Sequence, residues 1–295
     1  MDETSLRAVA AAVGEARSLG LCCTDEPEIL ADGANVLVHL RPAPVVARIA
    51  TTTALVRRPP QLWLERDLEM ARFLVGQGFP AAAPSGELPP GPHLRDGFAI
   101  SFWQFVQHER GYVCSAAETG SLLRELHGAL RGYKGHLERL SPFFEISGWL
   151  EDAEKMGALA ADDVAMLGQA HAQIAAAMEA QAARSGLPEQ ALHGDAHRKN
   201  LLKTKRGLHW TDFEDCCRGP VLWDAACFAR TAVEGKQAAL AAYGLEDGEK
   251  SLESFLEARE LQGVVWMALL ATRFADRRLR AEESLAAARS RYGRM

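Results

Sequence analysis

Apolar and polar positions alternate in two different patterns in the first half of the chain. Residues 1–20 repeat an apolar position every three or four residues with charged residues between, which predicts an amphipathic helix. In residues 26–50, β-branched and leucine runs are divided by Asp32-Gly33 and by residues 41–44. Asp-Gly supplies the positive φ of a tight hairpin, and proline is excluded from a central strand. This segment therefore predicts three antiparallel strands.

A helix and a further strand are predicted next. A helical pattern opens after Pro59-Pro60 and ends at Gly76 and Gly78, because proline suits the first turn of a helix and glycine its C-terminal cap. Residues 79–97 are rich in turn formers. The apolar run Phe98–Val106 then predicts a strand.

The remainder of the chain has mainly helical periodicity. We expect helices at residues 115–133, at about 160–185, and from 252 to the end. Strands followed by a longer helical region are typical of an α+β protein with a small sheet lobe and a larger helical lobe. The boundary is predicted near residues 107–111. The two domains would then span 1–106 and 107–295.

Composition narrows the class of protein. The 295 residues are 48% hydrophobic and 24% charged, no apolar run is long enough to span a bilayer, and no cationic leader opens the chain. We therefore expect a cytoplasmic protein without a membrane partner. A formal net charge of −6 argues against a nucleic-acid partner and suits a cationic small molecule. The vicinal pairs Cys22-Cys23 and Cys216-Cys217 predict reduced thiols.

The densest polar chemistry lies in the run LHGDAHRKNLL, which contains Asp195 and Asn200. A hairpin is predicted over residues 201–211, because short apolar segments flank Lys205-Arg206-Gly207. Such a hairpin places Asn200 beside Asp212. Asp195 lies one loop earlier, at the same end.

Two acids and an amide at one strand end meet the needs of phosphoryl transfer from ATP. One carboxylate accepts the proton of the attacking hydroxyl, while an amide oxygen and a second carboxylate hold Mg²⁺ against the phosphates. The spacing of Asp195 and Asn200 is that of the protein kinase catalytic loop, and Asp212-Phe213-Glu214 stands where those enzymes carry Asp-Phe-Gly. Gly194 replaces the arginine of the kinase loop.

Two other interpretations of these residues are open. The three side chains could serve only as caps in a polar turn and hairpin. Alternatively, His193 and His197 are four residues apart and could bind zinc with other side chains, namely His209, Cys216 or Cys217. Neither a Cys-x-x-Cys pair nor a metalloprotease glutamate accompanies them, which disfavours zinc.

Together the motifs resemble those of the aminoglycoside phosphotransferase and choline kinase family, kinase-like enzymes that phosphorylate small molecules. The matching residues are His193-Gly194-Asp195 with Asn200, Asp212 after an apolar strand, and the run GPVLWDAA at 219–226. The N-terminal strands, the strand Phe98–Val106 and the run LLRELHGAL occur in the family's order, so the resemblance covers most of the chain. It implies a two-lobed, protein-kinase-like fold.

The resemblance also implies roles for the acids and the amide. Asp195 would be the catalytic base, and Asn200 and Asp212 would be the magnesium ligands. Asp224 would be a buried acid that braces the catalytic loop. Residues 107–295 would then form the lobe that carries catalysis and binds the acceptor.

Two histidines and a hinge complete the expected site. His193 would hold the loop through a backbone hydrogen bond, and His197 would approach the phosphates. Residues 1–106 would bind the nucleotide, ATP or GTP. The hinge whose backbone bonds adenine would consist of four residues: Trp103, Gln104, Phe105 and Val106.

The sequence departs from the family at the cation that grips the phosphates. Kinase-like folds use a lysine on the third strand, yet the first lysine here is Lys134. Arg48, in a Val-Ala context, occupies that place, and a guanidinium can grip phosphate oxygens with a fork of donors. Its partner would be Asp67 or Glu65, of which Asp67 fits the family's helix better. A glycine-rich phosphate loop is absent, and residues 32–35 are the only substitute.

We therefore expect an ATP-dependent O-phosphotransferase, monomeric or homodimeric, that acts on a hydroxyl of an aminoglycoside or similar antibiotic. An amino alcohol or a sugar is an alternative acceptor, and a non-catalytic nucleotide-binding pseudokinase is a further alternative. A protein kinase is disfavoured because no Ala-Pro-Glu segment follows Asp212. A cationic acceptor would need acids near Asp195. One segment supplies them, either for that purpose or as an exposed helix start: Glu145, Glu151, Asp152 and Glu154.

Overall fold

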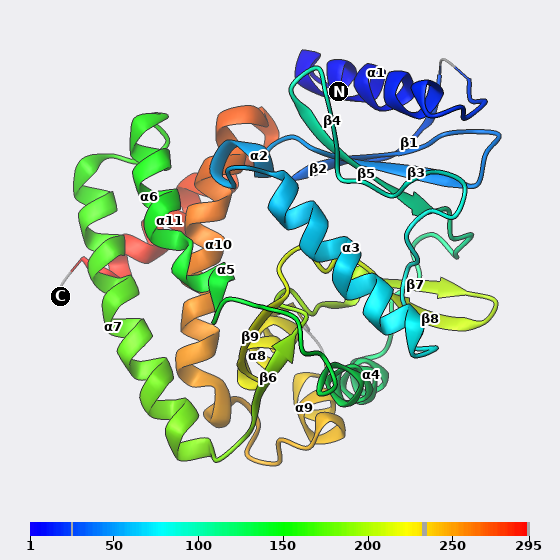
Figure 1. Ribbon diagram of the computed structural model, residues 1–295. Helices are drawn as coiled ribbons and strands as arrows, with labels where there is room; N and C mark the ends of the chain where they lie inside the picture. The colour runs from blue at the N-terminus through cyan, green and yellow to red at the C-terminus, as the bar shows by residue number, and fades with distance from the viewer. Residues whose placement is uncertain (25, 232–234, 294–295) are drawn as a thin grey trace. The chain divides into compact units, whose positions relative to one another are not determined.

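The computed structural model describes residues 1–24, 26–231 and 235–293 (Figure 1). The chain divides into two compact units, one of residues 1–112 with 199–215 and one of residues 113–198 with 216 onward. The first division lies close to the boundary expected at 107–111. The return of 199–215 to the N-terminal unit was not expected. Whether residues 1–106 and 107–295 are domains that fold independently stays a prediction.

The first unit is built on an antiparallel sheet. In spatial order its strands are β1 (Glu28–Asp32), β2 (Asn35–His39), β3 (Val45–Ala50), β5 (Phe98–Gln104) and β4 (His93–Arg95). The three strands predicted in residues 26–50 are confirmed. The next strand ends at Gln104 rather than Val106. Gln104 pairs with Val45, and Pro44 precedes Val45, so proline stops the ladder there.

Helices cover both faces of this sheet (Figure 1). On one face α1 (Glu3–Ser18) packs its buried alanines against apolar side chains of β2, β3 and β5. On the other face α3 (Gln61–Gly76), which follows the short α2 (Thr53–Val56), packs Leu64 against Ala50 and Ala99. Because side chains alternate along a strand, Ala47 and Ile49 of β3 face α1. Arg48 therefore points to the opposite face, where α3 lies.

The predicted hairpin is confirmed within the first unit. A 3₁₀ turn, η1 (Arg198–Asn200), leads into β7 (Leu201–Thr204), which pairs with β8 (Gly207–Trp210) from Leu201–Trp210 to Thr204–Gly207. The segment after α3 holds the hairpin through its backbone: Ala82 N donates to Trp210 O at 2.8 Å, and Trp210 N donates to Pro80 O at 3.0 Å. These bonds explain why residues 199–215 belong to this unit.

The second unit is mainly helical. A two-stranded antiparallel ribbon joins β6 (Glu189–Leu192) to β9 (Cys217–Pro220). The 21-residue helix α10 packs against α6, α7, α8 and α11. The helices described in the second unit, with two 3₁₀ turns, are α4 (Ala116–Leu130), α5 (Ser141–Phe144), α6 (Ile146–Lys155), α7 (Ala161–Ser185), α8 (Leu222–Thr231), α9 (Lys236–Tyr243), η2 (Gly248–Leu252), α10 (Glu253–Arg273), η3 (Ala275–Arg277) and α11 (Arg278–Tyr292).

Two of the three helices predicted in this unit are confirmed, and one is corrected. α4 starts where Ser115 caps it by accepting from Glu118 N at 3.2 Å, and α7 covers the expected range. The single helix expected from 252 onward is wrong. Phe274 adopts an extended conformation and separates α10 from α11, whose Arg289 then pairs with Asp163 of α7 at 2.6 Å.

The sequence was expected to contain no membrane span and to keep its cysteines as reduced thiols. In the described ranges, no helix combines the length and the apolar character that crossing a bilayer requires. The six cysteines all lie in described segments and form no disulfide. Cys216 and Cys217 are fully buried.

Candidate active site

Arg48 is buried in the first unit, where its guanidinium meets three carboxylates. Nη2 lies 2.6 Å from Asp212 Oδ1 and 2.7 Å from Glu214 Oε2, and Nη1 lies 3.3 Å from Asp67 Oδ2. Burial alone would lower the pKa of Arg48, but the carboxylates hold it well above its ordinary value. Asp67 is fully buried whereas Glu65 is exposed, so Asp67 is the helix acid that pairs with Arg48.

Asp67 also holds the segment that follows β8. Its Oδ1 accepts from Phe213 N at 2.8 Å, and this bond fixes the backbone next to Asp212. Burial raises the pKa of Asp67 to about 7, against the opposing effect of Arg48. Arg48 Nε and Asp67 Oδ2 are buried and make no hydrogen bond with a described residue. The group of charged side chains around Arg48 therefore contains buried polar atoms that no described residue satisfies with a hydrogen bond.

A second guanidinium, Arg57, extends this cluster. Glu214 accepts from Asn35 Nδ2 at 3.0 Å and lies 3.6 Å from Arg57 Nη1, and Arg57 also pairs with Asp215. Glu214, Asp215 and Arg57 were missed in the sequence, although two acids directly after the Asp212-Phe213 pair were a visible signal. We call the group the acidic cluster: Asp67, Asp212, Glu214 and Asp215 with Arg48 and Arg57.

Asn200 and Asp212 lie at the open end of the β7–β8 hairpin, as predicted. Thr211 N donates to Asn200 O at 3.0 Å, which brings the two chain segments together. Asp212 has a φ of 71°, a conformation uncommon for a residue other than glycine, and its side chain is 35% exposed. An amide oxygen and a carboxylate are donors that Mg²⁺ accepts. The two residues thus fit a magnesium ion that takes its remaining ligands from phosphate and water.

The zinc interpretation finds no support. Among the residues that the structure describes, no group of three or more His, Cys, Asp or Glu side chains is arranged to hold a metal ion. This includes His193, His197 and His209 as well as the vicinal pair Cys216-Cys217. The same result means that the acidic cluster is not a complete protein cage for a cation.

Part of the backbone of the predicted hinge is already hydrogen-bonded within the protein. Gln104 N donates to Ala83 O and Phe105 N donates to Pro44 O, at 2.9 and 2.8 Å. Trp103 is buried, and its Nε1 donates to Ser101 Oγ at 2.9 Å. Adenine would therefore need carbonyl oxygens of this segment, or N–H groups beyond Phe105, which donate to no described carbonyl before Glu109.

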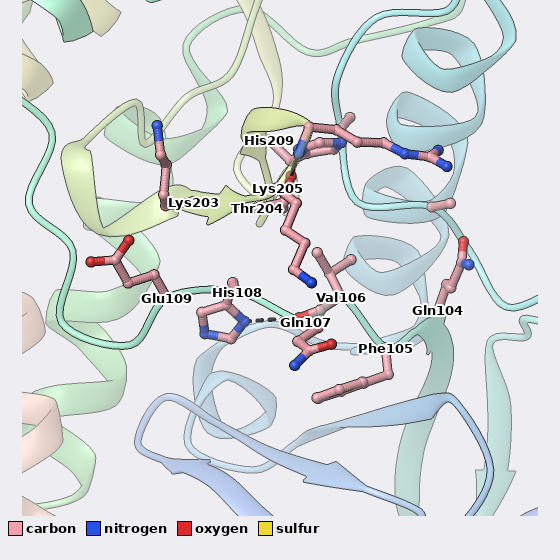
Figure 2. A pocket seen from close by; sticks show the side chains of 13 residues that line it. Gln104, Phe105, Val106, Gln107, His108, Glu109, Lys203, Thr204, Lys205 and His209 are labelled. Carbon is pink, nitrogen blue, oxygen red and sulfur yellow. Dashed lines mark hydrogen bonds between the residues drawn. The ribbon is translucent and has the colours of Figure 1, made fainter.

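A cavity of about 590 Å³ lies beside this segment, between it and the β7–β8 hairpin (Figure 2). Figure 2 shows the side chain of Lys205 extending toward Gln107, and His108 Nδ1 is within 2.8 Å of Val106 O. The wall includes Gln104, Phe105 and Val106 but none of the acidic cluster. The cavity is therefore separate from the charged groups expected to meet phosphate.

The loop His193-Gly194-Asp195 lies in the second unit, where Asp224 braces it. Asp224 Oδ2 accepts from His193 N at 2.8 Å, and Oδ1 accepts from Gly194 N at 2.9 Å. Burial alone would raise the pKa of Asp224, but the adjacent His127, 2.9 Å from Oδ2, holds it below its ordinary value. This is the bracing contact that the family resemblance implied. The part played by His127 was not expected.

Asp195 is held by three side chains. Oδ1 accepts from Arg259 Nη2 at 2.5 Å and from Cys227 Sγ at 3.3 Å, while Oδ2 lies 3.2 Å from His197 Nε2. Burial alone would raise the pKa of Asp195, but Arg259 and His197 hold it well below its ordinary value. Asp195 N donates to His193 Nδ1 at 3.3 Å, in line with the predicted role of His193. The carboxylate is thus ionised at neutral pH, with Oδ1 held by the protein.

Arg259 is the main site residue that sequence reasoning missed. It comes from α10, lies with Cζ 5.1 Å above the Trp223 ring, and donates to Gly194 O at 3.3 Å. Trp223 Nε1 donates to the same oxygen at 2.8 Å. A signal was present, because Arg259 falls on the apolar stripe of α10 between Phe255 and other buried positions. A charge on such a stripe needs a buried partner.

The structure thus groups the predicted residues within each unit. Arg48, Asp67 and Asp212 meet in the first unit, and His193, Asp195 and His197 meet in the second. Their catalytic and binding roles stay predictions.

Comparison with known proteins places the chain among kinases. Residues 30–261 match the model of the phosphotransferase enzyme family (APH). No curated protein sequence matches the chain.

Similar solved structures include an amicoumacin kinase in complex with AMP-PNP, Ca²⁺ and Ami, with a TM-score of 0.67, 14% identity, and coverage of 95% of this chain and 92% of that one. A choline kinase from Streptococcus pneumoniae has a TM-score of 0.61 at 15% identity over 93% and 97%. An aminoglycoside phosphotransferase from Streptomyces rimosus has a TM-score of 0.59 at 13% identity over 89% and 99%. These likenesses confirm the protein-kinase-like α+β fold.

Proposed function

The chain belongs to the phosphotransferase enzyme family, and we propose that it transfers the γ-phosphoryl group of ATP, with Mg²⁺, to a hydroxyl of a small molecule. As a member of this family it is a small-molecule kinase whose acceptor is an alcohol group, as the sequence predicted. The observation that carries the proposal is the state of Asp195. Its carboxylate is kept ionised, and Oδ1 is bound by Arg259 and Cys227.

In the proposed reaction Asp195 Oδ2 accepts a hydrogen bond from the acceptor hydroxyl and receives its proton. The hydroxyl oxygen forms a bond to the γ-phosphorus as the bond from that phosphorus to the β–γ bridging oxygen breaks, and ADP leaves. A carboxylate with a pKa well below its ordinary value is a weak base. Asp195 therefore acts mainly by orienting the hydroxyl, and the proton moves late.

The first unit would supply the nucleotide contacts. Arg48, fixed by Asp67, would donate to phosphate oxygens, and Asn200 and Asp212 would hold Mg²⁺. When bound, magnesium offsets the negative charge of the phosphates. The adenine contact stays a prediction for the segment Trp103–Val106, where carbonyl oxygens and the N–H of Val106 are the available groups.

The acceptor is proposed only by class. The similar structures include kinases that act on an antibiotic and a kinase that acts on the amino alcohol choline. An aminoglycoside or related antibiotic, an amino alcohol and a sugar are therefore the acceptors to screen, with mass detection of an added phosphoryl group. A nucleotide-binding pseudokinase would bind ATP and phosphorylate none of them.

The test of the catalytic role is Asp195→Asn. We expect turnover to fall at least about a hundredfold, because the amide is no longer an ionised acceptor, while ATP affinity is unchanged. Full activity in this variant would defeat the assignment.

Asp212→Asn should instead weaken magnesium-dependent nucleotide binding, measured by calorimetry with and without Mg²⁺. Equal nucleotide affinity under both conditions, in wild type and variant, would remove Asp212 as a ligand.

A further inference from the structure

Asp195 lies among arginine side chains in the second unit. Arg259 pairs with it directly, and Arg230 of α8 acts on it electrostatically. Arg198 donates to Cys114 O at 3.3 Å and to Thr231 O at 3.2 Å, and Thr231 is the residue after Arg230. We call Arg198, Arg230 and Arg259 the basic cluster.

Arg230 lies on the face of α8 that carries Cys227, and it meets the face of α10 that carries Arg259. Cys227 and Arg230 are three residues apart on α8, so they share a face, and Cys227 contacts Asp195 Oδ1 at 3.3 Å. On α10, Arg259 and Gly263 are four residues apart and also share a face. A Cβ on Gly263 would lie 2.4 Å from Arg230 Nη2. The Arg230 guanidinium therefore lies over Gly263, one helical turn from Arg259.

The charge of Arg230 is not matched by an acid of its own. No carboxylate in the described segments forms an ion pair with it. Glu260 is near enough to attract it, but Glu260 Oε2 is bound by Arg291 Nη1 at 2.6 Å. Loss of hydration, followed by repulsion from Arg259, lowers the pKa of Arg230. The side chain is nevertheless open to solvent and so accessible to a ligand.

Gly263 is an independent sign that this position of Arg230 matters. Glycine in a helix interior costs about 1 kcal/mol relative to alanine, and Gly263 lies in the middle of the 21-residue α10. The space that its missing Cβ leaves is occupied by the Arg230 guanidinium. α10 thus carries an unfavourable residue where it admits a second cation beside Arg259.

We propose that Arg230 binds an anionic group, a carboxylate or a phosphate, on the acceptor whose hydroxyl Asp195 orients. This inference rests on the proposed function and names the acceptor class for that site. A guanidinium can bind such a group through two parallel hydrogen bonds. The anion would also relieve the repulsion between Arg230 and Arg259.

The proposal reverses the charge that the sequence suggested for the acceptor. A cationic acceptor would meet the guanidiniums of Arg230 and Arg259, and the carboxylate of Asp195 is already paired with Arg259. The acids offered for a cation belong to α6 and its flank, where Glu151 is 72% exposed and pairs with Lys155 across one turn at 3.7 Å. That pair is typical of a solvated helix face.

The first test is a panel of alcohols in sets whose members differ only in one terminal group, which is anionic, neutral or cationic: glucuronate, glucose and 6-amino-6-deoxyglucose, and glycerate, glycerol and 3-amino-1,2-propanediol. Acceptor-dependent ADP release is measured with wild type and Arg230→Met, and exposed Arg280→Met serves as the matched control. We expect the acid of a set to have the highest kcat/KM. In Arg230→Met its kcat/KM should fall about tenfold to a hundredfold, and that of the neutral member less.

Two outcomes of this panel would overturn the proposal. One is preference for the amine, or no preference by charge. The other is an equal loss for all members of a set in Arg230→Met, which would place the guanidinium on the transferred phosphoryl group instead.

The second test uses no ATP and so is independent of turnover. Sulfate is titrated into nucleotide-free protein by calorimetry at constant ionic strength. We expect saturable binding in wild type and Arg280→Met, at least a tenfold weaker affinity in Arg230→Met, and a smaller loss of affinity in Gly263→Ala. In Gly263→Ala the new methyl group displaces the guanidinium while Tm stays the same or rises, which separates ligand binding from damage to the fold.

Sulfate binding that is the same in Arg230→Met as in wild type overturns the proposal whether or not any alcohol reacts. Failure of the proposed function gives a different result, namely turnover that survives Asp195→Asn while sulfate binding still depends on Arg230.

Discussion

The acidic cluster and the basic cluster are built from the same chemical groups in opposite proportions. In the first unit four carboxylates surround two guanidiniums, Arg48 and Arg57. In the second unit Arg259 and Arg230 lie near Asp195, and Glu260, which also attracts Arg230, is bound by Arg291. Each cluster therefore has an excess of one charge. An excess of charge is costly where it is buried, as it is around Arg48, and a ligand of the opposite sign would offset it in either cluster.

The difference indicates what each cluster binds. An excess of acid in the first unit suits a divalent cation, with Arg48 left to meet phosphate oxygens. An excess of base in the second suits an anion beside the reacting hydroxyl. The pairing within each cluster also differs, since Arg48 is shared by three acids whereas Asp195 draws on Arg259 and His197. Removal of one charge should then have unequal consequences.

The largest expected effect is on Arg48. Arg48→Met leaves Asp67 and Glu214 buried without the guanidinium that all three acids share, so we expect the free energy of unfolding to fall by about 3–5 kcal/mol. Urea unfolding at neutral pH measures this, and Arg48→Lys, which keeps the charge, should lose less. A loss below about 1 kcal/mol in Arg48→Met would show that the acidic cluster does not depend on this cation.

Arg259→Met should have a smaller effect on stability and a clear effect on the pH profile. Asp195 has a folded pKa below its ordinary value, so its ionised form contributes stability above the unfolded pKa that is lost as pH falls through the folded pKa. Without Arg259, burial dominates and the pKa rises. The acidic limb of kcat/KM, which needs ionised Asp195, should move to higher pH by about one unit or more.

The measurement is the dependence of kcat/KM on pH in wild type, Arg259→Met and Arg259→Lys with one acceptor. Arg259→Lys keeps a charge near Oδ1 and should move the limb less. A profile in Arg259→Met that overlays that of wild type, at reduced amplitude, would indicate that Arg259 only supports the fold.

The smallest expected effect is stabilisation of the free protein by ions. If the acidic cluster has an excess of negative charge, about 10 mM Mg²⁺ should raise Tm by no more than about 2–4 °C without nucleotide, through preferential binding to the folded state. Asp212→Asn should remove this rise. Scanning calorimetry with Mg²⁺ at matched ionic strength tests it, and an equal rise in both proteins would mean that the ion binds elsewhere.

Much of the first unit's chemistry could be predicted because it depends on local spacing. Alternation along β3 places Arg48 on the face opposite Ala47 and Ile49, and helical spacing on α3 puts Asp67 inside and Glu65 outside. The two-residue turn of the hairpin sets Asn200 opposite Thr211, one residue before Asp212. The end of β5 was misjudged because its limit is set by Pro44, which precedes the partner strand β3 and is far from β5 in the sequence.

The second unit's chemistry could be predicted only in part. The His193-Gly194-Asp195 run is visible in the chain, and so was the bracing acid Asp224. His197, two residues from Asp195, was among the expected site residues, but Arg259 and His127 were not. Arg259 is 64 residues away and His127 is 97 residues from the acid it contacts. No short-range repeat relates such positions, because α4, α8 and α10 meet through packing.

By itself the sequence determined the kind of side chain available at each local turn, strand and helix face: a carboxylate after the glycine of the catalytic loop, an amide at a hairpin end, and an arginine in place of the third-strand lysine. Only the tertiary structure decided which charges share a cluster, because side-chain packing between distant helices sets those distances. That packing gave one cluster an excess of acid and the other an excess of base.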